Sequence, residues 1–168
     1  MAKKILLIES EAVSALVDRV DDSFLLAIDL VDSCKGRVIT TGMGKSGIIA
    51  RKLAATFSST GTAAYFVHPA EALHGDLGAI QRTDVVVSLS HSGETPELVL
   101  LLEMTKRLGV KTITLNGSPN STLSKNGDIT INCAVKGEAC PLNLAPTAST
   151  TATLAIGDAF ALVQAYRR

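Results

Sequence analysis

Residues 90–95, with the sequence SHSGET, hold the side chains best suited to bind an anion. Hydroxyls stand at Ser90, Ser92 and Thr95, and Pro96 opens a helix that is expected over residues 96–108. The positive end of a helix and several hydroxyl donors together suit a phosphate monoester. A single hydroxyl would be enough to cap the helix, so three of them favour an anion site over a simple cap.

A second glycine-rich turn, GMGKSG, occupies residues 42–47. It matches the dinucleotide-binding pattern, but that pattern also needs an acid about 20 residues further on, at the end of the second strand. The second predicted strand runs into His68 instead, and a P-loop is excluded because Ile39 stands where its first glycine belongs. The remaining interpretation is a tight turn that brings Gly44, Lys45 and Ser46 to the strand ends. The plainer alternative for Lys45 is an ordinary surface lysine exposed to solvent.

Three further residues are candidates for proton transfer, each with a plainer explanation. Glu97 falls in the first turn of the expected helix, where the helix dipole alone favours an acid. Glu138 lies in an irregular stretch, where a glutamate usually serves solubility. His74 belongs to a turn over residues 68–78 that also holds two acids, and a metal site, a proton shuttle and a polar turn are all open for it.

Short apolar strands alternate with helices along the chain. The expected strands are residues 37–41, 63–67, 84–89, 111–116 and 129–133, and the expected helices are residues 10–33, 44–59, 96–108 and 150–166. This alternation predicts an α/β fold with a five-stranded, parallel, doubly wound (flavodoxin-like) sheet flanked by helices. Ligands bind such sheets beyond the carboxyl ends of the strands, where residues 42–47, 68–78, 90–97 and 136–149 are expected.

The last expected helix is apolar nearly all round, which predicts that it is buried. Asp158 stands among its apolar residues. A buried aspartate must be hydrogen-bonded, and we expect its partner in the loop before this helix.

Length and composition predict a single domain over residues 1–168, with residues 1–34 forming a helical segment that packs on it or on a neighbouring subunit. Lys and Arg number 16, as do Asp and Glu, so the chain lacks the basic field of a non-specific nucleic-acid binder. No apolar run reaches the roughly 18 residues of a membrane span, and the apolar start is too short for a signal peptide. These features predict a cytoplasmic protein without nucleic-acid or membrane partners, and the three unpatterned cysteines predict reduced thiols.

Four segments carry a resemblance to a known family. They are GMGKSG at 42–47, FVHPAEALHGDLG at 66–78, SHSGETPE at 90–97 and EACPLNLAPTASTTATLAIGDA at 138–159. The chain resembles the sugar isomerase (SIS) domain family from about residue 35 onward, and within it the arabinose 5-phosphate isomerases of lipopolysaccharide precursor synthesis. The cradle at 90–97 is shared by the whole family, whereas the second and fourth segments are specific to this group.

The resemblance implies interconversion of D-ribulose 5-phosphate and D-arabinose 5-phosphate through an enediol, for Kdo synthesis. It implies catalytic roles for Lys45, His74, Glu97 and Glu138, with either glutamate as the base. The implied substrate contacts are the phosphate-binding residues Ser90, Ser92 and Thr95 and the additional residues Gly44, Ser46, Thr147, Ser149 and Thr150. No metal and no cofactor are implied, the partner is a pentose phosphate, and the implied assembly is a homotetramer with shared sites.

Typical members of the group continue into a pair of CBS modules and carry a further functional histidine in an SHPGG-like segment. The sequence stops at Arg168, before such a segment. The open alternatives are an SIS isomerase of another sugar phosphate, a non-catalytic phosphosugar-binding SIS module and, more distantly, a nucleotide-dependent enzyme.

Overall fold

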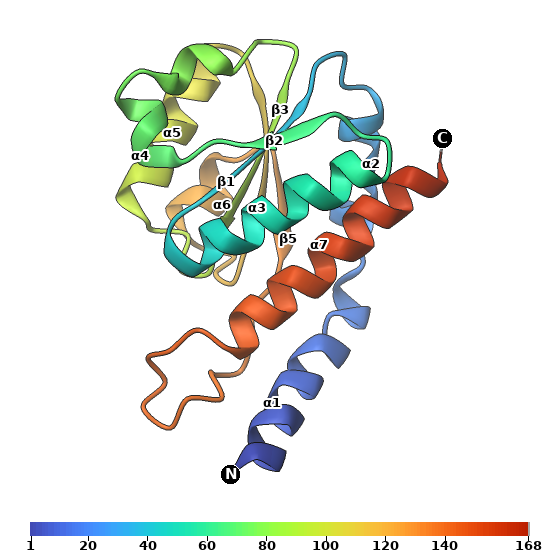
Figure 1. The fold of residues 1–168 in the computed structure, drawn as a ribbon, viewed down its shortest axis with the longest axis vertical. Coiled ribbons are helices and arrows are strands. Elements are labelled where there is room, and N and C mark those ends of the chain that lie inside the picture. The colour runs from blue at the N-terminus through green and yellow to red at the C-terminus, as the bar shows by residue number, and fades with distance from the viewer. Residues whose placement is uncertain (168) are drawn as a thin grey trace.

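Five parallel strands form the centre of the computed structural model, which describes residues 1–167 (Figure 1). They follow the order β2-β1-β3-β4-β5. Their bounds are β1 Val38–Gly42, β2 Ala64–Phe66, β3 Val85–Ser90, β4 Lys111–Asn116 and β5 Ile129–Asn132. Every residue of β1 and β3 is buried, as expected for parallel strands covered on both faces. The predicted fold is confirmed, and each strand lies within one residue of its predicted bounds.

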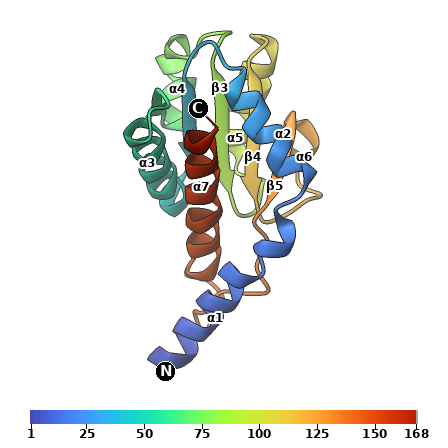
Figure 2. The same cartoon turned by 90° about the vertical axis from the view of Figure 1, so that its right-hand side faces the viewer.

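Helices cover both faces of this sheet (Figures 1 and 2). One face carries α2 (Asp22–Asp32), α3 (Gly44–Ser59) and α7 (Ala148–Tyr166), and the other carries α4 (Pro69–Leu73), α5 (Pro96–Arg107) and α6 (Thr122–Asn126). The main core lies under the first set, where α2, α3 and α7 each contribute one buried phenylalanine. Phe160 meets Phe24 and Phe57 edge-on, with ring centroids 6.0 and 5.4 Å apart. This geometry suits the aromatic quadrupoles and ties the three helices together.

The face beneath α5 and α6 becomes polar toward the carboxyl ends of the strands. Thr41, Ser88, Thr114 and Thr130 stand side by side on β1, β3, β4 and β5. Alternate residues of a strand share a face, and Ile39 and Val86, two residues earlier, pack against Leu101 of α5. The hydroxyl row therefore lies on the α5 side, directly before the strand ends.

The N-terminal segment corrects one prediction, because the single helix expected over residues 10–33 is wrong. The structure has α1 (Ala2–Ser14), a 3₁₀ turn η1 (Val17–Arg19) and then α2. Asp21 is extended, and its carboxylate accepts hydrogen bonds from the backbone N–H groups of Ser23 and Phe24 (2.9 and 3.3 Å), so it caps a new helix. The apolar repeat continues across this break, which is why the spacing predicted one helix.

Helix α1 reaches beyond the sheet and packs along α7 (Figure 2). None of its residues is buried. The hydroxyl of Thr151 on α7 donates to the Glu9 carboxylate at 2.9 Å, which fixes the two helices to each other.

Helix α7 begins at Ala148, two residues before its predicted start, and it buries one side against α3 and the sheet while Leu162 remains exposed. The expected partner of Asp158 was wrong. Its carboxylate is half-buried and forms an ion pair with Lys52 of α3, because α3 and α7 pack side by side.

Short elements fill the segments that lacked a clear period. The predicted turn at 68–78 contains α4 and a 3₁₀ turn, η2 (Asp76–Ala79), and α6 follows β4. Within residues 1–167, no helix is both long enough and apolar enough to cross a membrane.

Candidate functional site at the carboxyl edge of the sheet

Three helix N-termini meet the carboxyl edge of the sheet, because α3, α5 and α7 each follow a strand that ends there. The residue before α3, Met43, and the residue before α5, Thr95, supply no side-chain cap to their helices. The first N–H groups of both helices therefore need another partner, and their dipoles favour a negative one. The N-terminus of α7 is different, since the carboxylate of Glu138 already occupies it.

The serine–threonine loop between β3 and α5 is folded around its own hydroxyls. Ser90 is buried, and its Oγ accepts a hydrogen bond from the Gly93 N–H (3.1 Å) and lies 3.2 Å from Thr95 Oγ1. The Ser92 Oγ accepts from the Glu94 N–H at 3.2 Å on the exposed side. Thr95 thus bonds to Ser90 and leaves its helix uncapped, which favours the predicted anion cradle over a capping role. Phosphate contacts from these three hydroxyls remain a prediction.

Gly93 has the conformation on which this loop depends. Its φ of 68° lies in the left-handed region, and a Cβ there would stand 2.1 Å from Ser121 Oγ. Ser121 is buried and accepts a hydrogen bond from the Asn116 amide at the end of β4 (3.3 Å). The Glu94 carboxylate accepts from the Thr122 N–H at 2.8 Å, and hydrogen bonds from the side chain and then the backbone of Thr122 lower the pKa of Glu94 below its ordinary value. The cradle is therefore fastened to α6 by residues that the sequence reasoning did not single out.

The turn at 42–47 owes its glycines to a close approach of strand and helix. A Cβ on Gly47 would stand 2.6 Å from the carbonyl oxygen of Gly42, and Gly44 has a φ of 54°. The close approach at Gly47 and the positive φ of Gly44 explain the spacing of the glycines, so no bound dinucleotide is needed to explain it. Lys45 is exposed in the first turn of α3 and forms no ion pair with any residue of the described range 1–167.

A small pocket of about 30 Å³ brings three of the predicted segments together. It is lined by Ser46, Ile49, His91, Pro146, Ser149, Thr150 and Thr153. Ser46, Ser149 and Thr150 were among the candidate substrate contacts. His91 was not, although its place between Ser90 and Ser92 is a signal that could have found it.

Glu138 is held at the start of α7. Its Oε2 accepts hydrogen bonds from the Thr147 N–H (2.8 Å), the Thr147 hydroxyl (3.1 Å) and the Ser149 N–H (3.2 Å). Burial raises the pKa of Glu138, but hydrogen bonds from Ser149 and Thr147 outweigh it, and the pKa lies below its ordinary value. Glu138 is therefore an ionised, tightly bound carboxylate at neutral pH and not a free solubilising residue.

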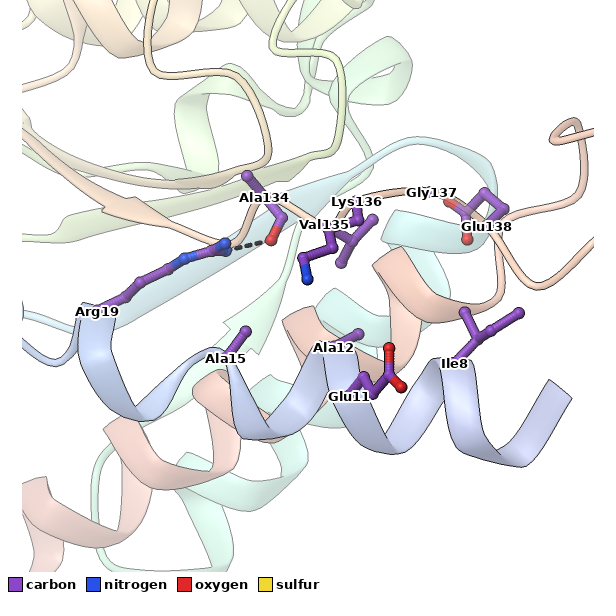
Figure 3. Close-up of a pocket in the computed structure, with 10 residues that line it drawn as sticks. All are labelled: Ile8, Glu11, Ala12, Ala15, Arg19, Ala134, Val135, Lys136, Gly137 and Glu138. Atoms are coloured by element: carbon purple, nitrogen blue, oxygen red, sulfur yellow. Dashed lines mark hydrogen bonds between the residues drawn. The ribbon is translucent and has the colours of Figure 1, made fainter. Parts of the chain in front are cut away.

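Glu138 also borders a larger pocket of about 310 Å³ under α1 (Figure 3). The pocket lies between α1 and η1 on one side and residues 134–138 on the other. Arg19 closes one end by donating a hydrogen bond to the carbonyl oxygen of Ala134, and Glu11 and Lys136 add further charges. The Glu138 carboxylate thus stands between this pocket and the first turn of α7.

The other catalytic candidates are dispersed around the edge. Lys45, His74 and Glu97 line neither of these two pockets. His74 is exposed at the end of α4, and Glu97 is half-buried in the first turn of α5. Among residues 1–167, no three His, Cys, Asp or Glu side chains are grouped so that they could hold a metal ion.

The three free cysteines are expected to differ sharply in reactivity. Burial raises the pKa of the Cys133 thiol to about 12, whereas backbone hydrogen bonds from Ala145 and Leu144 lower the pKa of Cys140. We expect iodoacetamide at pH 7.5 to label Cys140 first and Cys133 roughly a thousandfold more slowly, because the thiolate is the nucleophile. Peptide mass spectrometry of the folded protein measures both rates, and equal rates for the two thiols would contradict the structure.

Comparison with known proteins identifies relatives of this chain. The family model of the SIS domain matches residues 33–163. The chain is 51% identical over 161 residues to a Pseudomonas aeruginosa protein named arabinose 5-phosphate isomerase KdsD, a match that covers 96% of this chain and 49% of that protein. It is 49% identical over 160 residues to the protein of the same name from Escherichia coli K12, covering 95% and 49%.

The fold of the chain is also very similar to that of a solved structure. Escherichia coli CFT073 c3406 in complex with arabinose 5-phosphate superposes with a TM-score of 0.95 at 44% identity, covering 99% of this chain and 88% of that one. The chain spans about half the length of the curated relatives it matches. From the family match and these similarities, the chain belongs to the SIS domain family.

Proposed function

We propose that the protein is an aldose–ketose isomerase that interconverts D-ribulose 5-phosphate and D-arabinose 5-phosphate. The observation that carries the proposal is the uncapped N-terminus of α5 surrounded by the hydroxyls of Ser90, Ser92 and Thr95. Such a cradle suits the phosphate of a phosphosugar. The relatives named arabinose 5-phosphate isomerase, and the neighbour solved with arabinose 5-phosphate, support the choice of sugar.

The proposed substrate lies across the carboxyl edge of the sheet. Ser92, Thr95 and the first N–H groups of α5 hold its phosphate, and Ser90 keeps the loop in shape while adding its own contact. Gly44 and Ser46 approach from the second uncapped helix, α3. Ser149 and Thr150 contribute from the pocket shared with Ser46.

The proposed reaction moves a proton between C1 and C2 through an enediol, which requires a base and a group that stabilises charge on oxygen. Glu97 or Glu138 carries the proton, and the Lys45 ammonium stabilises the enediolate oxygen. His74 assists ring opening or relays a proton. The ionised state of Glu138 at neutral pH supports its role as a proton acceptor.

We further propose that the enzyme acts in the cytoplasm as a homotetramer and supplies arabinose 5-phosphate for Kdo and lipopolysaccharide precursors. The support for assembly is α1, which projects from the domain and leaves Leu6 and Leu7 67% and 63% exposed. Adjacent exposed leucines on a projecting helix suit a contact with another protein surface.

The test is incubation of the protein with D-ribulose 5-phosphate while arabinose 5-phosphate is measured directly. We expect arabinose 5-phosphate as the product. Binding of arabinose 5-phosphate without turnover would instead favour a non-catalytic phosphosugar module. Turnover restricted to a hexulose or heptose phosphate would favour an SIS isomerase of another sugar.

A further inference from the structure

The loop from Glu138 to Thr147 is closed by one side chain that bonds in both directions. The Thr147 hydroxyl accepts a hydrogen bond from the Ala139 N–H (2.9 Å) and donates its proton to Glu138 Oε2 (3.1 Å). The Thr147 N–H donates to the same carboxylate oxygen at 2.8 Å. The hydroxyl that was expected to contact the sugar is thus engaged inside the loop.

Asn143 holds the same segment from the other side. Its side-chain Oδ1 accepts a hydrogen bond from the Glu138 N–H at 2.7 Å, and its own N–H donates to the Cys140 carbonyl oxygen at 2.8 Å. Its φ of 52° makes it the one non-glycine residue with positive φ among residues 1–167. Asparagine tolerates this conformation better than most residues, but the conformation still costs free energy. This strained residue is the one whose side chain holds the Glu138 N–H.

We propose that Thr147 and Asn143 are positioning residues that clamp the Glu138 carboxylate so that Oε2 is fixed and Oε1 carries the proton of the isomerisation. The inference rests on the proposed function and deepens it. Three donors converge on Oε2, so this oxygen is the one fixed at the start of α7, and Oε1 is the oxygen that we assign to the substrate. A carboxylate held in this way cannot rotate its two oxygens, so the same oxygen faces the substrate in every turnover.

Charged side chains line the pocket beside the clamp, but hydrogen bonds from Ser149 and Thr147 are what lower the pKa of Glu138. On the pocket side, Arg19 from η1 and Lys136 from the preceding segment bring positive charge, and Glu11 from α1 opposes them. No acid lies in the first turn of α7, whose dipole also favours the anion. Loss of one hydrogen-bond donor to Oε2 therefore raises the pKa of Glu138 toward its ordinary value.

The test compares Thr147→Val, which removes the hydroxyl and keeps the shape, with Thr147→Ser, which restores it. We expect Thr147→Val to lower kcat by about 10- to 100-fold with KM within about twofold, because small misplacements of a catalytic group have large effects on rate. The acid limb of its pH–rate profile should move to higher pH. Thr147→Ser should restore most of the wild-type kcat and return the acid limb close to its wild-type pH. The matched control is Thr151→Val, since the Thr151 hydroxyl on the same helix face bonds to Glu9 and not to Glu138.

Asn143→Gly separates the effect of the Asn143 side chain from the effect of its backbone conformation. Glycine adopts the observed φ freely, so this variant removes only the acceptor for the Glu138 N–H. We expect a smaller fall in kcat in the same direction, with KM again little changed. This second variant keeps the proposal testable if Thr147→Val does not fold.

Two outcomes separate this proposal from the proposed function. If the wild-type protein isomerises no sugar phosphate, the function fails. The clamp is still measured by a ¹³C NMR titration of the Glu138 carboxyl, whose pKa should be higher in Thr147→Val than in wild type. Variants that unfold at lower temperature but keep the wild-type kcat, pH profile and Glu138 titration would overturn the clamp and leave Thr147 and Asn143 with a structural role alone.

Discussion

Replacing Glu97 or Glu138 by glutamine is expected to lower kcat by roughly 10²- to 10⁴-fold, the usual contribution of a positioned acid or base. Glutamine keeps the size of the side chain and an oxygen acceptor but cannot carry the proton. For Glu138, the amide oxygen can still accept from Thr147 and Ser149, so the loop should persist. Steady-state kinetics with ribulose 5-phosphate measure the fall.

The binding of arabinose 5-phosphate by both variants, measured by calorimetry, should stay close to that of wild type. Glu103→Gln is the control, because Glu103 is an exposed glutamate on the same helix as Glu97. Near-normal turnover in both Glu97→Gln and Glu138→Gln would remove both glutamates from the reaction, and the proposed mechanism would fail with them.

The substitution Gly93→Ala is expected to abolish phosphosugar binding and to lower the free energy of unfolding by roughly 2–4 kcal/mol. Two effects add, since alanine strains a φ of 68° and its Cβ would stand 2.1 Å from Ser121 Oγ and 2.4 Å from Ser121 Cβ. Ser121 is buried and cannot move aside without breaking its contacts with Asn116 and Ser124. The loop that carries the cradle hydroxyls must therefore shift.

Denaturant unfolding and calorimetric titration with arabinose 5-phosphate measure the two effects of Gly93→Ala. Gly78→Ala is the matched control, because a Cβ at Gly78 meets no atom within 4 Å and its φ lies outside the positive region. If Gly93→Ala bound the sugar as well as Gly78→Ala does, the cradle would lie elsewhere.

The architecture could be predicted because its signals are local. Strand β3 begins with three consecutive valines and is buried throughout, and Pro96 and Gly109 mark the two ends of α5 in the sequence itself. The anion cradle could be proposed for the same reason, since its three hydroxyls lie within six residues of one another, and anion binding there stays a prediction. Features of this kind depend only on residues that are close together in the sequence, so one sequence is enough to predict them.

What could not be predicted depends on contacts between distant segments. Asp158 finds Lys52 across two packed helices, and Gly93 is constrained by Ser121. The break before α2 was not predicted, because Asp21 caps the helix within an apolar repeat that continues across the break. The mutual proximity of Ser46 and Thr150 likewise follows only from the packing of α3 against α7.

The catalytic candidates divide in the same manner. Lys45, His74 and Glu97 were candidates from their positions in the sequence, and the family resemblance supplied their catalytic roles. The structure adds no pocket or ion pair around them among residues 1–167. Glu138 is different, since its three hydrogen bonds at the start of α7 give a physical reason for its ionised state. No spacing rule connects a loop glutamate to a helix that begins ten residues later.

The dependence of Glu138 on α7 has a consequence for a chain emerging from the ribosome. Residues 90–126, which build the cradle and its attachment to α6, leave the ribosome before residues 138–166. Helix α1 is synthesised first, yet its Glu9 must await Thr151, a partner 142 positions later. The residues of the proposed phosphate-binding loop and of its attachment to α6 are therefore synthesised before the residues that hold the Glu138 carboxylate, and the contacts of Glu138 are among the last that the chain can make.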